Sequence, residues 1–174
     1  NAYLSTRLPM SFYRFLRPFL FCLDPEKAHH TAMYWLIASG GTLRRVLPRN
    51  DAGLEKTVFG VRFPNPVGLA AGFDKNGVAL PAWQGLGFGF AEIGTVTARA
   101  QPGNPKPRVF RLEKDQAIIN RMGFNSAGLD AVIERLARRP RSGIVGVNLG
   151  KNRDSGDAVA DYELGIRRAA RFAD

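Results

Sequence analysis

Asn65-Pro66-Val67-Gly68-Leu69-Ala70-Ala71-Gly72-Phe73-Asp74-Lys75-Asn76-Gly77 is the stretch that decides the predicted fold. Its apolar part, Val67 to Ala71, contains no charge and is bounded by turn residues, which predicts a buried strand. Ala71 and Gly72 leave the main-chain N–H groups open to a planar or phosphorylated ligand. Lys75 then adds a positive charge that can meet an anion. The alternative is a tight strand-to-helix turn with a solvated lysine.

The rest of the body alternates between apolar runs and amphipathic segments. Residues 90–96 and 144–150 predict two more buried strands, and the shorter runs 57–63, 109–112 and 117–119 predict a ribbon and a small hairpin. Amphipathic segments follow the three buried strands and predict helices at residues 78–86, 127–139 and 157–172. This alternation is typical of a parallel sheet covered by helices.

Two folds have such a sheet, the doubly wound sheet and the barrel. No GxGxxG follows a strand and no GxxxxGK[ST] occurs, which disfavours a Rossmann site and excludes a P-loop. The sequence therefore predicts an α/β protein, a (β/α)8 TIM barrel with its chemistry at the carboxyl ends of the strands. Such a barrel needs about 250 residues. We therefore expect residues 55–174 to be its first part, truncated before the fourth barrel strand.

Residues 1–54 predict a small two-helix N-terminal domain. Apolar residues recur at helical spacing from Phe12 to Leu23, with Pro18 either kinking or starting that helix. Asp24 is the expected N-cap of the second helix, Pro25 its first residue, and Gly40-Gly41 its end. The helices either pack their apolar faces on their own domain or lie at a membrane surface. In the second case the basic cluster Arg44, Arg45 and Arg49 would meet lipid headgroups.

Composition limits the classes of partner. The formal net charge of +10 and the pI of about 10.5 favour an anionic partner, such as nucleic acid, an anionic membrane face or an acidic small molecule. Cys22 is the only cysteine, so it forms no internal disulfide, and a reducing compartment is expected. His29 and His30 are the only histidines and have no Cys/His partners, so no metal site is predicted. Neither a membrane-spanning run nor a signal peptide is evident, so any membrane contact is expected to be peripheral.

Amide side chains follow the predicted strands. Asn120, Asn125 and Asn148 lie beside glycines, and each amide can donate and accept hydrogen bonds. Such groups suit a uracil-like or flavin-like ring, in which N–H and C=O groups alternate; Lys75 suits a carboxylate, and Thr95 can supply a hydroxyl. Taken singly, an asparagine in such a place is more often a turn or cap residue. No Ser/His/Asp triad is predicted.

Several long motifs occur in order and together resemble one enzyme family, class 2 (quinone-dependent) dihydroorotate dehydrogenase. They are Leu-Asp-Pro-Glu-Lys-Ala-His (23–29), Asn-Pro-Val-Gly-Leu-Ala-Ala-Gly-Phe-Asp-Lys (65–75), Glu-Ile-Gly-Thr-Val-Thr (92–97), Pro-Gly-Asn-Pro-Lys-Pro-Arg-Val-Phe-Arg-Leu (102–112), Ile-Asn-Arg-Met-Gly-Phe-Asn-Ser (119–126) and Gly-Val-Asn-Leu-Gly-Lys-Asn (146–152). The similarity covers nearly the whole chain.

The resemblance implies oxidation of dihydroorotate to orotate on FMN in pyrimidine (UMP) synthesis, with electrons passing to a membrane quinone. It implies FMN contacts from Ala71, Gly72, Phe73, Asp74, Lys75, Thr95 and Asn148. It implies substrate contacts from Lys75, Asn120, Arg121, Met122, Gly123 and Phe124, and a quinone tunnel bordered by His29 and Arg111. The family's catalytic base is a serine after the fourth strand, which would lie beyond Asp174, so no catalytic residue is expected in this chain.

The same resemblance implies where the protein works and what completes it. We expect a peripheral protein on the cytoplasmic face of a bacterial inner membrane, with the mitochondrial inner membrane as the alternative. A second chain carrying the rest of the barrel is one way to complete the site. Two other functions remain open at this point: a flavin barrel acting on another dihydropyrimidine, and a basic nucleic-acid-binding protein. The second lacks any nucleic-acid-binding module pattern, so no nucleic-acid partner is expected.

Overall fold

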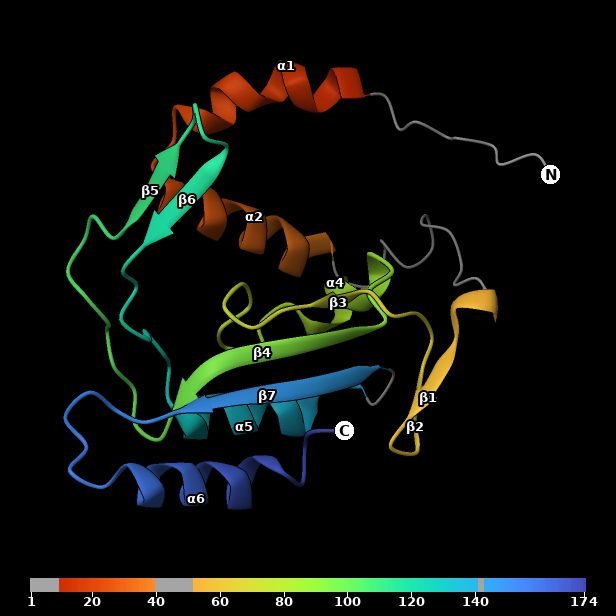
Figure 1. Ribbon diagram of the computed structural model, residues 1–174, viewed down its shortest axis with the longest axis vertical. Coiled ribbons are helices and arrows are strands. Elements are labelled where there is room, and N and C mark those ends of the chain that lie inside the picture. The colour runs from red at the N-terminus through yellow and green to blue at the C-terminus, as the bar shows by residue number, and fades with distance from the viewer. Residues whose placement is uncertain (1–9, 40–51, 141–142) are drawn as a thin grey trace.

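A three-stranded parallel sheet lies at the centre of the molecule (Figure 1). The computed structural model describes residues 10–39, 52–140 and 143–174. The sheet contains β3 (Gly68–Leu69), β4 (Phe90–Thr97) and β7 (Ile144–Gly150) in the order β3-β4-β7. All neighbouring strands run parallel, with Leu69 opposite Ala91 and Ala91 opposite Val145. The strands therefore present their carboxyl ends at one common edge.

Three helices follow the three parallel strands and cover one face of the sheet. They are α4 (Leu80–Gly85), α5 (Leu129–Arg138) and α6 (Ala158–Ala169), and the last begins at an N-cap in which Asp157 accepts a hydrogen bond from the Ala160 N–H. Alternate strand residues point into this layer because successive side chains of a strand face opposite ways. The core that results includes Ile93, Val96, Leu129, Val132, Leu136 and Val145, all at most 1% exposed.

The intervening residues point to the opposite face of the sheet, which carries the polar side chains. Glu92, Thr95 and Asn148 lie there, and each is only partly buried. Among the described strands, β7 pairs only with β4, so its other edge has no strand partner in this part of the chain. In a closed barrel this face would line the interior.

Two antiparallel hairpins lie at opposite ends of the sheet (Figure 1). A one-turn 3₁₀ helix (Ala52–Leu54) leads into β1 (Lys56–Val58) and β2 (Val61–Phe63), which pair near the amino ends of the parallel strands. β5 (Val109–Leu112) and β6 (Ala117–Asn120) pair on the other side, inserted between β4 and α5.

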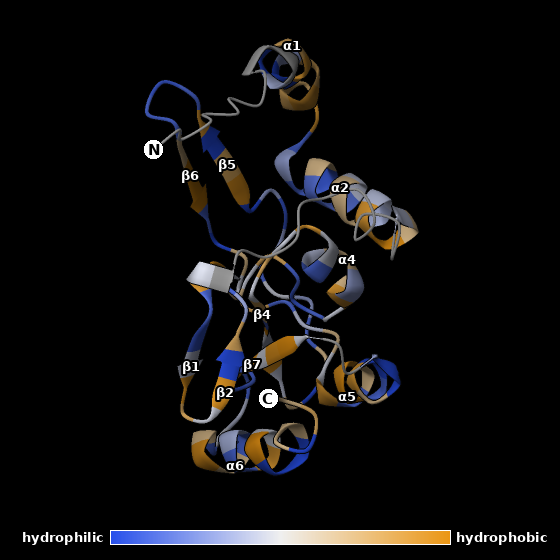
Figure 2. Cartoon of the chain, turned by 90° about the vertical axis from the view of Figure 1, so that its right-hand side faces the viewer, coloured by the Kyte–Doolittle hydropathy of each residue, from blue (hydrophilic) through white to orange (hydrophobic). Residues whose placement is uncertain are grey.

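The N-terminal helices α1 (Met10–Phe21) and α2 (Pro25–Ser39) lie beyond the body, next to the β5–β6 hairpin (Figure 2). Asp24 caps α2 as predicted, since its Oδ1 accepts hydrogen bonds from the Glu26 and Lys27 N–H groups, each at 3.0 Å. Pro18 lies inside α1. Much of the aromatic surface of these helices is exposed: Tyr13, Phe15, Phe19, Tyr34 and Trp35.

The predicted elements of the body are confirmed with changed bounds: the three helices are shorter, β4 and β6 each extend one residue further, and one strand differs most. β3 contains only Gly68 and Leu69, and Val67 is 60% exposed although the apolar run predicted a buried strand over 67–71. Among the described strands β3 pairs only with β4, so the other side of this run has no strand beside it in this part of the chain. The predicted helix end at Gly40-Gly41 and the basic cluster Arg44, Arg45 and Arg49 lie outside the described residues.

Candidate functional site

The backbone after β3 is open where the sequence predicts a ligand. Gly72 has a φ of +106°, and nothing lies within 4 Å of the position that a Cβ would take. Its N–H donates to the Gly94 carbonyl oxygen at 2.8 Å, which ties the end of β3 to β4. The left-handed conformation favours glycine. This turn is therefore fixed in position but leaves a face of bare backbone accessible.

Asp74 fixes the segment that carries Lys75. The Asp74 carboxylate is 1% exposed and accepts hydrogen bonds from the Val78 N–H, the Ala79 N–H and the Trp83 indole N–H, each at 2.9 Å. The Asp74 carbonyl oxygen also accepts from the Gly77 N–H at 3.4 Å. The whole residue is therefore used inside the protein, where it holds the turn in place. Burial, followed by the nearby Arg108 guanidinium, lowers the pKa of Lys75 from its ordinary 10.5. Desolvation makes this ammonium group a stronger partner for an anion.

Thr95 and Asn148, predicted to contact one ring, are in direct contact across β4 and β7. The Thr95 hydroxyl donates to Asn148 Oδ1 at 2.6 Å, and Asn148 Nδ2 donates to Glu92 Oε1 at 3.0 Å. This network fixes the orientation of the Asn148 amide, because its oxygen accepts and its nitrogen donates. Glu92 was not predicted to be a site residue, although it is the first residue of the motif at 92–97.

A cavity of about 600 Å³ opens beside this network. Of the expected site residues, Thr95, Gly123, Phe124 and Asn148 line it. Its volume is in the range of small-molecule sites, roughly 300–1,000 Å³. The structure does not place Ala71 to Lys75, Asn120 to Met122, His29 or Arg111 in its wall. Other residues, not predicted to belong to the site, also line the cavity: Gln101, Leu149, Gly150, Lys151, Asn152, Arg153 and Tyr162.

The expected substrate loop, residues 120–124, runs from the end of β6 toward the cavity. Asn104 holds it: the Asn104 N–H donates to the Met122 carbonyl oxygen at 3.0 Å, and its Nδ2 donates to the Arg121 carbonyl oxygen at 2.7 Å. Phe124 is 59% exposed with a φ of +52°. The neighbouring Asn125 has a buried side-chain oxygen with no hydrogen-bond partner.

His29 and Arg111 lie where α1 and α2 meet the body. The His29 ring packs edge-on against Phe73, with 4.7 Å between centroids, so helix α2 contacts the expected FMN segment directly. Burial, followed by the neighbouring His30, lowers the pKa of His29 from 6.5. Arg111 donates to the Leu23 carbonyl oxygen at 2.7 Å and lies over the Phe21 ring, 4.6 Å from its centroid.

Two buried polar groups organise the loops around the site, and both were missed. Asn152 is 2% exposed; its Nδ2 donates to the Arg99 carbonyl oxygen and to Gln101 Oε1, and its Oδ1 accepts from the Arg99 N–H. Arg108 forms two hydrogen bonds with Glu26 of α2, at 2.6 and 3.1 Å, with both residues at most 7% exposed. Asn152 is the last residue of the motif at 146–152, and Arg108 lies within the motif at 102–112. The spacing of residues in these motifs did not predict a role for either side chain.

The Glu26–Arg108 pair makes folding stability depend on pH. Hydrogen bonding to Arg108 lowers the pKa of Glu26 below 4.5, so the pair stabilises the fold above that pH and loses this contribution as the pH falls through the lowered pKa. Glu26→Gln is expected to reduce the free energy of unfolding by about 3 kcal/mol at pH 7, because it leaves a buried guanidinium without its counter-charge. Urea unfolding of both proteins between pH 7 and about pH 3 measures the difference, which should shrink toward acid. A difference that is constant over this range would contradict the assignment.

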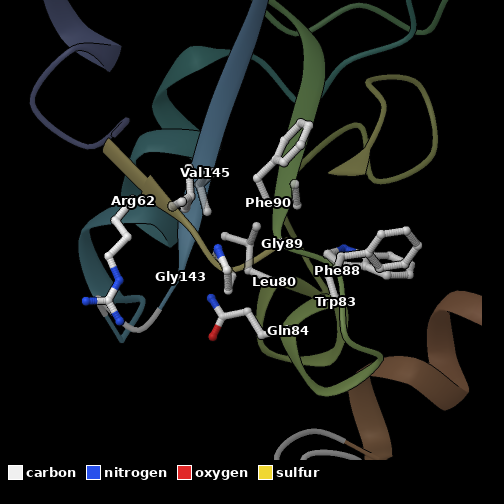
Figure 3. A pocket seen from close by; sticks show the side chains of 12 residues that line it. Arg62, Leu80, Trp83, Gln84, Phe88, Gly89, Phe90, Gly143 and Val145 are labelled. Atoms are coloured by element: carbon white, nitrogen blue, oxygen red, sulfur yellow. The ribbon is translucent and has the colours of Figure 1, made fainter. Parts of the chain in front are cut away.

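A second cavity, of about 320 Å³, lies at the amino ends of the strands (Figure 3). Arg62 of β2, Leu80 and Gln84 of α4, Phe90 of β4 and Val145 of β7 line it. In barrels the chemistry occurs at the carboxyl ends. This cavity therefore lies at the opposite end of the sheet from the expected site residues. Among the described residues, no group of three or more His, Cys, Asp or Glu side chains is arranged to hold a metal ion.

Comparison with known proteins agrees with this geometry. The family model described as dihydroorotate dehydrogenase matches residues 53–174. The chain belongs to the dihydroorotate dehydrogenase family. Dihydroorotate dehydrogenase (quinone) of Rhodopseudomonas palustris (strain HaA2) is 56% identical over 154 residues, which are 87% of this chain and 41% of that protein. The protein of the same name from Erythrobacter litoralis is 49% identical over 162 residues, 92% of this chain and 46% of that protein.

Solved structures of the family confirm the predicted fold class. The dihydroorotate dehydrogenase of Eimeria tenella in complex with ferulenol is 49% identical, has a TM-score of 0.74 and matches 87% of this chain and 42% of its own. The ligand-free form gives a TM-score of 0.75. The β3-β4-β7 sheet and its helices are therefore the first units of an α/β barrel. The chain spans less than half the length of the relatives and structures that it matches.

Proposed function

We propose that this chain forms part of an enzyme that oxidises dihydroorotate to orotate with FMN and passes the electrons to a quinone. One observation carries the proposal. The end of β3 with its half-buried Lys75, the Thr95–Asn148 pair and the substrate loop lie at the carboxyl ends of adjacent barrel strands, in a member of this family. The nucleic-acid-binding alternative rested on the net charge alone, and membership of an enzyme family argues against it.

The residues present fit FMN. The bare backbone at Gly72 leaves room beside it for a planar ring. The oriented Asn148 amide keeps one further acceptor position and one further donor position beyond its bonds to Thr95 and Glu92. We propose that Ala71 to Lys75, Thr95 and Asn148 hold the cofactor, with the buried Asp74 fixing the turn on which its neighbours lie. FMN, when bound, supplies the acceptor for the hydride that leaves dihydroorotate.

Lys75 and the substrate loop would then bind and orient the pyrimidine. The Lys75 ammonium would meet the substrate carboxylate, and Asn120 to Phe124 would contact the ring, with the Asn120 amide donating and accepting at its edge. At present Asn120 Oδ1 accepts only a long hydrogen bond, 3.4 Å, from the Met122 N–H, so the amide can exchange this contact for a ligand. We propose that the base which removes the adjacent proton comes from outside residues 1–174.

A different pyrimidine would use the same edge groups, so the carboxylate decides the substrate. Orotate carries this group and uracil does not. We therefore expect both compounds to inhibit competitively, with an inhibition constant for orotate at least about a hundredfold lower than that for uracil. Uracil offers no carboxylate to the half-buried ammonium group of Lys75. Equal inhibition by the two would favour a dihydropyrimidine substrate instead.

We propose that residues 1–54 form a membrane and quinone module and that His29 and Arg111 border the quinone path. The exposed aromatic residues of α1 and α2 support contact with an apolar surface, and the His29–Phe73 contact links this module to the FMN segment. Within the described ranges, no helix is both long enough and apolar enough to cross a bilayer. A peripheral position on the cytoplasmic face of a bacterial inner membrane is the proposed location.

Removal of residues 1–54 tests this module. The enzyme without them is expected to lose at least about 90% of its quinone reductase activity and its binding to anionic liposomes, because the apolar surface that receives the quinone is gone. At saturating dihydroorotate, oxidation with a soluble dye should continue at a rate within about threefold of the intact enzyme. Quinone turnover that survives the deletion would overturn the membrane proposal.

A further inference from the structure

The loop between β4 and β5 connects helix α2 to the substrate loop through a single buried guanidinium. Arg108 Nε and Nη2 donate to Glu26 of α2, while its Nη1 donates to the carbonyl oxygens of Pro102 at 2.7 Å and Asn104 at 3.0 Å. Arg108 is 7% exposed. Its planar fork can hold a carboxylate and two carbonyl groups together, which a lysine could not.

Asn104 extends this connection to the expected substrate loop. It bonds the Arg121 and Met122 carbonyl oxygens through its side chain and main chain, and the Arg121 N–H donates to the Arg108 carbonyl oxygen at 2.8 Å. Loop residues 120–124 therefore have three hydrogen bonds to residues 104 and 108. The chain of contacts from α2 is Glu26, Arg108, Asn104 and then Arg121 with Met122.

We propose that Arg108, anchored by Glu26, is a positioning residue that holds the substrate loop in its pyrimidine-binding conformation and couples it to the docking of α2. The proposal rests on the proposed function. Arg108 needs no contact with the substrate: it acts through Asn104. Glu26 supplies the counter-charge that keeps the guanidinium buried. Lys106 Nζ lies 3.5 Å and His30 Nε2 lies 3.9 Å from Glu26 Oε1.

The test compares Arg108→Gln with the wild type in the active, flavin-loaded enzyme that contains this chain. The dissociation constant of orotate, from the flavin absorbance change, and the KM for dihydroorotate are both expected to rise about tenfold. The kcat with a soluble dye should stay within about threefold, since the loop still closes on saturating substrate. A role in stability alone would lower the amount of folded enzyme without this separation of KM from kcat.

Arg138→Gln provides a matched control, because Arg138 forms an ion pair with Glu134 on the surface of α5, with both side chains at least 60% exposed. It should leave both constants unchanged. If Arg108→Gln does not fold, Arg108→Lys and Glu26→Gln take its place, each with an expected rise of about threefold. A folded, flavin-loaded variant at Arg108 or Glu26 with the wild-type orotate constant would overturn the inference. If the wild type itself fails to bind orotate, the proposed function fails instead.

Discussion

Lys75→Met is expected to reduce dihydroorotate oxidation by about a thousandfold. The substitution keeps an unbranched side chain, one atom shorter, and removes the only charge that the segment 70–77 offers besides the internally bonded Asp74. Lys75 is half buried, and its lowered pKa records the loss of water around the ammonium group. A fixed charge in such a place contributes far more than one in water, and removal of one typically costs about 10²–10³ in rate.

Stopped-flow reduction of the flavin by dihydroorotate measures this effect directly. Lys114→Met is a suitable control because Lys114 is exposed in the turn between β5 and β6. Lys75→Arg should recover only part of the rate, since a planar fork does not reproduce a compact ammonium. If Lys75→Met reduces the flavin within about tenfold of the wild-type rate, the assignment of Lys75 to the site is wrong.

Asp74→Ala is expected to reduce the free energy of unfolding by about 4 kcal/mol. The substitution leaves the Val78 and Ala79 N–H groups and the Trp83 indole N–H without their acceptor at a buried position. Each buried donor left without a partner costs roughly 1–3 kcal/mol, and a carboxylate acceptor raises that value. Because the same carboxylate fixes the turn that carries Lys75, flavin content should fall with stability.

Urea unfolding followed by tryptophan fluorescence measures the change. Asp130→Ala is the matched control: Asp130 pairs with Arg168 at the surface, its side chain is 85% exposed, and the expected change is at most about 1 kcal/mol. Asp74→Asn should fall between the two, because one amide oxygen accepts where two carboxylate oxygens did. A change below about 1 kcal/mol in Asp74→Ala would show that the three hydrogen bonds contribute little.

The strands and helices were predictable because buried positions recur at a fixed spacing in each element, and apolar residues mark that spacing in a single sequence. The apolar runs at 90–96 and 144–150 correspond to β4 and β7, and Asp24 caps α2 as expected. The motif after β3 predicted an open glycine turn, which Gly72 forms. Val67 was misjudged because the other side of its apolar run has no strand beside it in the described part of the chain.

The contacts that hold the site together were not predictable in this way. Glu26 and Arg108 are 82 residues apart, so no local spacing indicates that they pair. Asp74 was expected to face the cofactor, whereas its carboxylate bonds three donors within the next nine residues. Polar residues carry no periodic signal, so the partner of each one emerges only when the chain is folded.

Reduction of the flavin by dihydroorotate in the absence of oxygen tests the central claim most directly. The purified enzyme that contains these 174 residues is mixed with dihydroorotate, and the flavin absorbance is followed before and after a quinone is added. We expect the absorbance to fall on mixing and to return with quinone, and we expect the isolated residues 1–174 to show neither change. An enzyme whose bound flavin is not bleached by dihydroorotate would contradict the account.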